Sequence, residues 1–369
     1  MRILVRMPNW LGDTILALPS LRALINNFPE AEIWVAAPSR SLELFEVESG
    51  IAGVVEIPEL LTVSAGWRLS RRWREFRFDL TILFPNSFSS AMLAWLAGIP
   101  ERWGYRSDGR AWLLTKAIAR EPKISKLEEE ETEKKEDHQA IYYLNLLRQL
   151  NLKVPTEPEI KIKITDEEKE MGRQRLLSLG LDPLKMRAQR KPLVVLNPGA
   201  AYGPAKRWPT SRFGFLAANL EKALEAVCLI IGSREEENLA KEIIEAAQEK
   251  RIGRTPLNLC GKTTLRELTS VLSWANLMIT NDSGPMHLAN ALRVPVVALF
   301  GPTDPRKTRP WHEPSFVLHK KVICWPCWYR VCPYDHRCLA AITEAEVLEA
   351  SLSLLQTSEA KRDESGCLS

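Results

Sequence analysis

Residues 277–305, LMITNDSGPMHLANALRVPVVALFGPTDP, decide the fold of this chain. The stretch opens with an apolar run, continues with the polar residues 281–284, and then carries apolar residues at helical spacing over 286–292. A second apolar run follows at 295–300. The pattern predicts strand, turn, helix and strand, which together make a right-handed βαβ unit of a parallel sheet.

The polar turn of this unit has the chemistry of an anion site. Ligands of parallel sheets bind beyond the carboxyl ends of the strands, and the two polar turns, 281–284 and 301–305, fall at that edge. Asp282 or Ser283 can cap the helix, and Gly284 lets the backbone approach a ligand closely. The first helical amides would then face a phosphate.

Two residues just inside the predicted helix complete this interpretation. Pro285 suits the first turn, where its missing N–H costs nothing, and the ring of His287 lies about one turn further in, within reach of the same site. The alternative is an ordinary capped turn with a histidine on the surface. This stretch alone favours neither.

Length and composition place the chain among soluble globular proteins. Its 369 residues predict roughly two domains, and 45% hydrophobic and 26% charged residues are ordinary values. It has no apolar run of about eighteen residues or more, and residues 1–7 are too short and too interrupted for a signal peptide. We therefore expect a cytoplasmic protein, at most peripheral on a membrane. The formal charge of +4 is too small to indicate nucleic-acid binding.

The first half of the chain also opens as βαβ. We expect a strand at 3–6, a loop at 7–13, a helix at about 14–27 and a strand at 33–36. The loop has no GxGxxG pattern, which argues against a nicotinamide dinucleotide fold. Asp13 stands where strand meets helix, so its carboxylate is either a general base at the ligand edge or a helix cap.

Two basic segments follow in the first half. Residues 67–77, WRLSRRWREFR, mix five arginines with aromatic residues. An amphipathic basic helix of this kind can rest on an anionic membrane or an acidic glycolipid, or it can be a solvated face with aromatic anchors in the core. Arg102, Arg106 and Arg110 are expected in a second basic loop near the ligand edge, where guanidinium groups match phosphates and carboxylates.

A change in composition marks the domain junction. The mixed-charge run at 122–137 is expected to be a solvated loop leading into a helix, and the prolines of 154–158 end the helical pattern. We place the junction near 151–165. The expected parts are an N-terminal domain at 1–160, a C-terminal domain at 161–343, and a closing helix with a polar tail at 344–369.

The second half repeats the alternation of strands and helices. Its loop 197–209, NPGAAYGPAKRWP, follows a buried strand, and Lys206 and Arg207 in this loop could neutralise a diphosphate. A strand at 227–231 leads to the acidic run 235–237 at a helix start. A carboxylate there can bind the two hydroxyls of a ribose, or it can simply favour the helix dipole.

Taken together, these turns resemble one family. The motifs are MPNWLGD (7–13), PNSFSS (85–90), GIPERWGYRSDGR (98–110), NPGAAYGPAKRWP (197–209), and TNDSGPMHLANAL with ALFGPTDP (280–305). In this order they look like the bacterial lipopolysaccharide heptosyltransferases of glycosyltransferase family 9. The branch that they resemble most is that of the ADP-heptose:lipopolysaccharide heptosyltransferases II, and the likeness runs nearly end to end.

The resemblance implies an α/β fold of GT-B type, with two Rossmann-like doubly wound domains facing a cleft. The N-terminal domain would bind the acceptor, heptosyl-Kdo2-lipid A, beside the inner leaflet of the inner membrane. The C-terminal domain would bind ADP-L-glycero-D-manno-heptose. Heptose would pass with inversion to the heptose of the inner core, without a cofactor or a metal ion.

The same resemblance assigns roles to residues. Asp13 would be the base that deprotonates the acceptor hydroxyl, and Lys206, with the amides of Ser283 and Gly284, would stabilise the departing diphosphate. The other candidates are Glu236, within an uncertainty of one residue, for the ribose, Asp282 and His287 in the donor site, and Arg102 and Arg106 for the acceptor.

Other functions fit the same turns. Heptosyltransferases I and III share the scaffold and act on other core acceptors. A nucleotide-sugar epimerase or hydrolase of this fold would turn over the donor alone. A non-catalytic, membrane-associated sugar-binding protein would bind ADP and release none from ADP-heptose.

Four cysteines cluster near the C-terminus. Residues 324–338 hold them with one histidine, beginning with a CxxC pair. In a reducing cytoplasm such a cluster favours a metal over disulfides, although free thiols or redox-labile bridges are the alternatives. The clustered residues are Cys324, Cys327, Cys332, Cys338 and His336. Cys228 and Cys260 are expected in the core.

Overall fold

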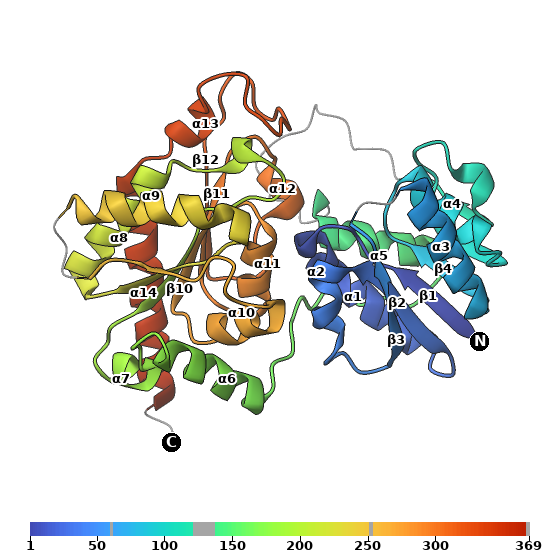
Figure 1. The fold of residues 1–369 in the computed structure, drawn as a ribbon, viewed down its shortest axis with the longest axis horizontal. Helices are drawn as coiled ribbons and strands as arrows, with labels where there is room; N and C mark the ends of the chain where they lie inside the picture. The colour runs from blue at the N-terminus through green and yellow to red at the C-terminus, as the bar shows by residue number, and fades with distance from the viewer. Residues whose placement is uncertain (60–61, 121–136, 251–253, 367–369) are drawn as a thin grey trace. The chain divides into compact units, whose positions relative to one another are not determined.

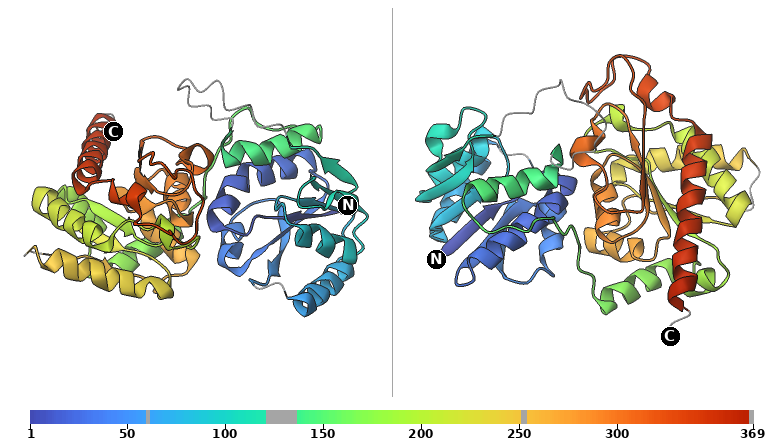
Figure 2. Two further views of the ribbon diagram at one scale, coloured as in Figure 1. Left: turned by 90° about the horizontal axis from the view of Figure 1, so that it is seen from above. Right: turned by 180° about the vertical axis from the view of Figure 1, so that it is seen from behind.

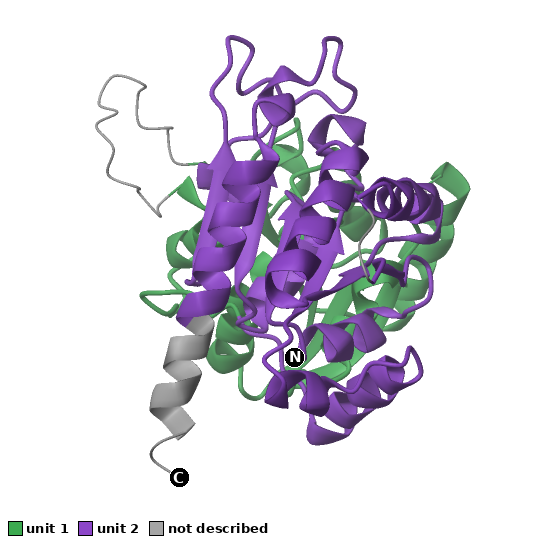
Figure 3. Ribbon diagram, turned by 90° about the vertical axis from the view of Figure 1, so that its left-hand side faces the viewer, with its two compact units in different colours: residues 1–160 green, residues 161–369 purple. Residues whose placement is uncertain are grey.

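The computed structural model describes residues 1–59, 62–120, 137–250 and 254–366. The chain forms two compact units, Met1–Ile160 and Lys161–Ser369 (Figure 3). Of the charged run expected as a loop at 122–137, residues 122–136 lie outside the described residues. Each unit is an α/β structure in its own right.

In its described residues, the first unit has a sheet of six parallel strands in the order β3-β2-β1-β4-β5-β6 (Figure 1). The strands are β1 (Arg2–Arg6), β2 (Glu32–Pro38), β3 (Ile51–Ile57), β4 (Leu80–Leu83), β5 (Glu101–Tyr105) and β6 (Lys116–Ile118). The helices are α1 (Leu11–Asn27), α2 (Ser39–Leu42), η1 (Glu43–Phe45), α3 (Val63–Glu75), α4 (Phe88–Leu96), η2 (Ala111–Leu113) and α5 (Gln139–Gln149).

The second unit has a sheet of six described parallel strands, in the order β12-β11-β10-β7-β8-β9. The strands are β7 (Leu193–Asn197), β8 (Val227–Ile230), β9 (Leu257–Asn258), β10 (Leu277–Asn281), β11 (Val296–Phe300) and β12 (Ser315–His319). The helices are α6 (Asp166–Leu177), α7 (Pro183–Ala188), η4 (Pro204–Lys206), α8 (Thr210–Leu224), η5 (Arg234–Glu236), α9 (Glu237–Gln248), α10 (Leu265–Leu272), α11 (Gly284–Ala291), α12 (Pro305–Thr308), α13 (Arg337–Ala340) and α14 (Glu344–Gly366).

The stretch that opened the sequence analysis folds as predicted. β10, α11 and β11 form a βαβ unit, and Met278 pairs with Val296 in parallel register. Every residue of β10 and β11 is buried, because helices cover both faces of the sheet (Figure 2). Strands buried on both faces read as continuous apolar runs, which is why the sequence displays them clearly.

The two sheets have the same topology. Counted from β1 in one unit and from β7 in the other, each follows the order 3-2-1-4-5-6 of a doubly wound fold. In such sheets the chain reverses direction between two central strands, and ligands bind beyond the carboxyl ends of that pair. The pairs here are β1 with β4, and β7 with β10.

The last helix belongs to the core of the second unit. Val347, Ala350 and Leu354 of α14 are buried in the same apolar cluster as Trp208 and Phe213. None of the described helices combines the length and the apolar character that crossing a bilayer requires.

Candidate active site

Polar side chains interlock at the carboxyl ends of β7 and β10. The amide Nδ2 of Asn197 donates to the hydroxyls of Ser283 at 2.7 Å and of Thr280 at 2.9 Å. In return, Nδ2 of Asn281 donates to the carbonyl of Pro198 at 2.7 Å. Each asparagine therefore reaches across to the neighbouring strand, which fixes the turn 281–284 at the topological switch point.

Ser283 does not cap α11 with its side chain. It occupies the N-cap position, but its hydroxyl lies with Asn197, so the predicted capping bond was wrong. Pro285 does lie in the first turn, as expected. The start of α11 thus keeps amides that no capping side chain takes, and the positive end of its dipole favours an anion.

Lys206 and Asp282 form an ion pair at the same edge. Their side chains are 12% and 5% exposed, so both charges are largely withdrawn from water. The Asp282 carboxylate also accepts hydrogen bonds from the hydroxyls of Thr303 at 2.7 Å and Thr308 at 3.4 Å. The ammonium of Lys206 lies 4.8 Å from the ring centre of Tyr202. Asp282 therefore fixes where the lysine charge sits.

The cysteine-rich segment holds the loop that carries Lys206. The Tyr202 hydroxyl donates to the carbonyl of Trp328 at 2.6 Å, and the amide of Ala205 donates to the carbonyl of Arg330 at 3.1 Å. Gly203, at φ +154°, has no room for a side chain, because an added Cβ would lie 2.3 Å from the Arg330 oxygen. The loop therefore lies against the backbone of this segment.

The same segment also contacts the loop at 301–305, which follows β11. The indole of Trp325 donates to the carbonyl of Thr303 at 3.1 Å, and the amides of Cys327 and Trp328 donate to the carbonyl of Pro302, each at 3.1 Å. Thr303 in turn bonds Asp282. The segment thus bridges the two loops that position the Lys206–Asp282 pair.

The cysteines of this segment are thiols in the structure. Cys324, Cys327, Cys332 and Cys338 form no disulfide, and in the described part of the chain no group of three or more His, Cys, Asp or Glu side chains is arranged to hold a metal ion. Burial raises the pKa of Cys338. Burial also raises the pKa values of the core thiols Cys228 and Cys260, each to about 12.

Glu236 lies where β7 and β8 end. Its carboxylate accepts a hydrogen bond from the amide of Ser233 at 2.9 Å and lies 3.8 Å from the guanidinium of Arg207. A Cβ added to Gly199 would lie 2.2 Å from its Oε1. The glycine therefore leaves room for this carboxylate at the ligand edge of the sheet.

His287 is buried in the second turn of α11, so the alternative of a surface histidine was wrong.

Asn197, Tyr202 and Thr303 did not stand out in the sequence. All three lie inside the quoted strand-end motifs, so their position at the sheet edge was the available signal.

In the first unit, the loop at 7–13 is held from both ends. Arg6 is buried at the end of β1 and donates to the carbonyl of Met7 and the side chain of Asn9. Burial lowers the pKa of Arg6 to about 10. At the other end, the hydroxyl of Thr14 donates to the carbonyl of Pro8 at 3.0 Å. The loop therefore has a defined conformation at the end of β1, where the amide of Met7 also donates to the carbonyl of Ala36 in β2 at 2.9 Å.

Asp13 lies in the first turn of α1. The helix begins at Leu11, with Trp10 at the N-cap position, so it starts earlier than predicted and Asp13 is not its cap. The carboxylate is partly exposed. Burial, followed by the negative charge of Asp13, raises the pKa of Tyr143 on α5. A carboxylate in the first turn of a helix, near the positive end of the helix dipole, can accept a proton from a substrate.

The arginines at 102–110 do not form one basic loop, because residues 101–105 are the strand β5. Arg102 is the second residue of that strand, and its guanidinium donates to the carbonyls of Leu113 at 2.6 Å and Pro100 at 3.0 Å. Arg106 is exposed and follows the carboxyl end of β5. Arg110 is fully buried, where its Nε donates to the Tyr105 carbonyl at 3.0 Å, and burial lowers its pKa to about 10.

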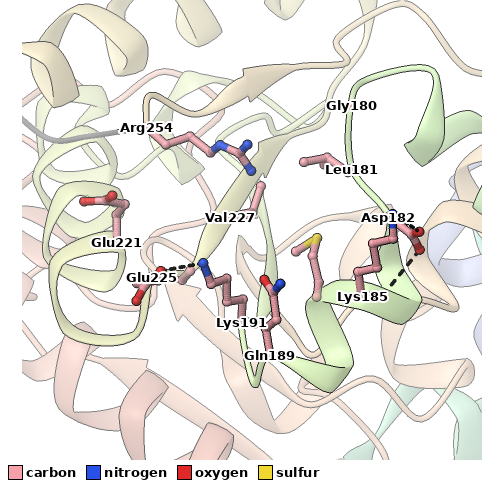
Figure 4. Close-up of a pocket in the computed structure, with 12 residues that line it drawn as sticks. Gly180, Leu181, Asp182, Lys185, Gln189, Lys191, Glu221, Glu225, Val227 and Arg254 are labelled. Carbon is pink, nitrogen blue, oxygen red and sulfur yellow. Dashed lines mark hydrogen bonds and ion pairs between the residues drawn. The ribbon is translucent and has the colours of Figure 1, made fainter.

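A hollow of about 460 Å³ in the second unit lies at the opposite end of its sheet (Figure 4). Lys191 and Val227 on its wall stand where β7 and β8 begin. Lys191 pairs there with Glu225 at 2.5 Å. The hollow has acidic groups in equal number to its basic groups and lies away from the carboxyl ends of the strands, so it is separate from the Lys206–Asp282 cluster.

The sequence matches a family model over most of its length. The model of glycosyltransferase family 9 (heptosyltransferase) matches residues 66–337. The chain belongs to this family. Lipopolysaccharide heptosyltransferase 2 of Salmonella typhimurium is 31% identical over 96% of the chain and 99% of its own length. Lipooligosaccharide heptosyltransferase 2 of Campylobacter jejuni is 29% identical over 97% of the chain and 99% of its own length.

A solved structure agrees with these relatives. The ADP-heptose lipopolysaccharide heptosyltransferase II of E. coli superposes with a TM-score of 0.76 at 28% identity, covering 97% of this chain and all of that one. This family member is therefore a glycosyltransferase of GT-B type, with two Rossmann-like doubly wound domains.

Proposed function

We propose that this chain transfers L-glycero-D-manno-heptose from ADP-heptose to the heptose of heptosyl-Kdo2-lipid A, as a heptosyltransferase II. The observation that carries the proposal is the Lys206–Asp282 pair at the β7/β10 switch point, in a chain that matches heptosyltransferases 2 almost end to end. The transfer would take place on the cytoplasmic face of the inner membrane, where the protein makes peripheral contact with the inner leaflet.

The donor site of the proposal lies in the second unit. Asp282 holds Lys206, and Lys206 neutralises the diphosphate together with the amides of Ser283 and Gly284 at the start of α11. Glu236, at the ends of β7 and β8, accepts hydrogen bonds from the ribose hydroxyls. His287, buried in α11, completes the donor site.

The acceptor side lies in the first unit. Asp13 takes the proton of the acceptor hydroxyl as its oxygen attacks the anomeric carbon from the face opposite the phosphate. The bond from that carbon to the β-phosphate oxygen breaks, ADP leaves with the electron pair, and the configuration inverts. Arg106, exposed after β5, binds acidic groups of the acceptor. Arg102 stabilises the neighbouring segment through its hydrogen bond to the carbonyl of Leu113.

One assay tests the proposal. Purified protein is incubated with ADP-heptose, with and without heptosyl-Kdo2-lipid A, and both ADP and the lipid product are followed. We expect ADP and product in equal amounts, and only when the acceptor is present. ADP or an altered sugar formed from the donor alone would indicate a hydrolase or an epimerase, and bound but unconsumed donor would indicate a binding protein. Transfer only to an acceptor without the first heptose would indicate heptosyltransferase I.

A further inference from the structure

Three exposed tryptophans lie on neighbouring elements of the first unit. Trp67 on α3, Trp95 on α4 and Trp112 on η2 are 56%, 47% and 66% exposed. The rings of Trp95 and Trp112 lie 6.4 Å apart. Large apolar side chains are costly to leave in water in a group, and such a patch usually marks an interaction site.

The arrangement of α3 brings Trp67 to the same border. Val63, Trp67, Arg71 and Arg74 recur at intervals of four and three residues and so share one side of the helix. Arg74 on that side donates to the carbonyl of Leu96 at 2.7 Å, at the end of α4. The side of α3 that carries Trp67 therefore borders the end of α4 that carries Trp95, and Figure 1 shows the two helices side by side.

Positive charge lies at the α3 end of this patch. Arg68, Arg71 and Arg72 are exposed, and they form no ion pair with any residue of the described chain. The buried face of α3, with Leu69 and Trp73, fills the core, so the arginine-bearing face is the one left without a partner. Unpaired arginines beside exposed tryptophans match the headgroup region of an anionic bilayer, where indoles sit at the interface and arginines meet lipid phosphates.

We propose that α3, the end of α4 and η2 form a membrane-docking surface that binds anionic phospholipid. Trp67, Trp95, Trp112 and Val63 enter the headgroup region, and Arg68, Arg71 and Arg72 bind lipid phosphates. The inference deepens the proposed function, because a lipid-anchored acceptor is reached from the bilayer surface. The docking itself needs neither donor nor acceptor.

Vesicle co-sedimentation of the full chain tests the proposal. The vesicles contain phosphatidylcholine, either alone or with roughly one third phosphatidylglycerol, and carry no lipid A. We expect binding to the anionic vesicles that weakens as salt is raised. The triple variant Trp67→Ala, Trp95→Ala, Trp112→Ala should bind about tenfold more weakly or worse. The triple variant Arg68→Gln, Arg71→Gln, Arg72→Gln should lose about fivefold for each charge.

A matched control removes exposed apolar side chains from the second unit. Met171 and Leu184 are 40% and 48% exposed, and Met171→Ala with Leu184→Ala should leave vesicle binding unchanged. Trp95→Ala with Trp112→Ala should also keep the kcat for a delipidated, water-soluble acceptor. Vesicle binding that survives both triple variants, or an equal loss in the control, would overturn the proposal. A chain that docks but transfers no heptose would refute the proposed function and leave this inference standing.

Discussion

The two topological switch points of this chain have the same topology and opposite chemistry. At β7 and β10, Lys206 and Asp282 are largely buried as an ion pair, and the hydroxyls of Thr303 and Thr308 bond the carboxylate, so a positive group is fixed in place before any ligand arrives. At β1 and β4, the carboxylate of Asp13 is partly exposed in the first turn of α1. The fold determines where a ligand can bind, and a few residues at the strand ends determine what it can be.

Within the second unit, the largest effect should come from removing the fixed cation. In Lys206→Met, the kcat for heptose transfer should fall about a hundred- to a thousandfold, because the charge that develops on the departing diphosphate loses its main partner. The fold should persist, since Thr303 and Thr308 still bond Asp282. Steady-state ADP release measures the effect. The exposed Lys241→Met serves as the control, and a kcat within threefold of wild type in Lys206→Met would show that the switch point of the second unit is not the donor site.

A smaller effect should follow from disturbing the contact that holds the Lys206 loop against the backbone of Arg330. Gly203→Ala places a methyl group against the carbonyl of Arg330 and should move the Lys206 loop, lowering kcat/KM about ten- to a hundredfold. Gly180→Ala is the matched control, because Gly180 also has a positive φ, +76°, but open space around it. If both variants lose the same activity, general strain and not the position of Lys206 is responsible.

A few-fold effect should distinguish the ribose contact. Gly199→Ala should push the carboxylate of Glu236 aside at little cost in stability, because only the end of a flexible side chain has to move. We expect the KM for ADP-heptose to rise about three- to tenfold, in Gly199→Ala and in Glu236→Gln alike, with the acceptor KM unchanged. A donor KM that does not change in Glu236→Gln would remove Glu236 from the donor site.

The smallest expected effect distinguishes the roles of two arginines of the first unit, Arg102 in stability and Arg106 in acceptor binding. Arg102→Gln should lower the free energy of unfolding by about 1–2 kcal/mol, because it loses hydrogen bonds to backbone carbonyls. Arg106→Gln should leave stability unchanged and raise the acceptor KM a few-fold. Thermal unfolding and acceptor titration of both variants measure this. The opposite outcome, a stable Arg102→Gln and an unstable Arg106→Gln, would reverse the two roles.

The sequence predicts the second unit better than the first. Its ligand-edge residues lie in short turns next to long apolar runs, so periodicity alone places Asp282 and Ser283 at the sheet edge. The first unit contains strands that periodicity does not reveal, because β5, with the sequence ERWGY, alternates too little and carries Arg102. A long side chain can turn inward onto carbonyls or outward to solvent, and only the packing around it decides which.

The details of the site depend on distant segments. The sequence offers no signal that the backbone of Trp328 and Arg330 holds the loop of Lys206, because these contacts join residues more than a hundred positions apart. The bond from Asn197 to the Ser283 hydroxyl, which replaces the expected helix cap, joins residues 86 positions apart and could not be foreseen either. Local patterns predict the elements, and tertiary contacts set the side-chain geometry.

The most direct test of the proposal that the first unit supplies the base and the second unit binds the nucleotide measures transfer and ADP binding in one preparation of Asp13→Ala. Transfer to heptosyl-Kdo2-lipid A should fall about a hundred- to ten-thousandfold, because the variant lacks the proposed base. The Kd for ADP, measured by calorimetry, should stay within about twofold of wild type, because the proposed nucleotide site in the second unit is unchanged. Transfer at the wild-type rate, or a loss of ADP binding as large as the loss of transfer, would contradict the account.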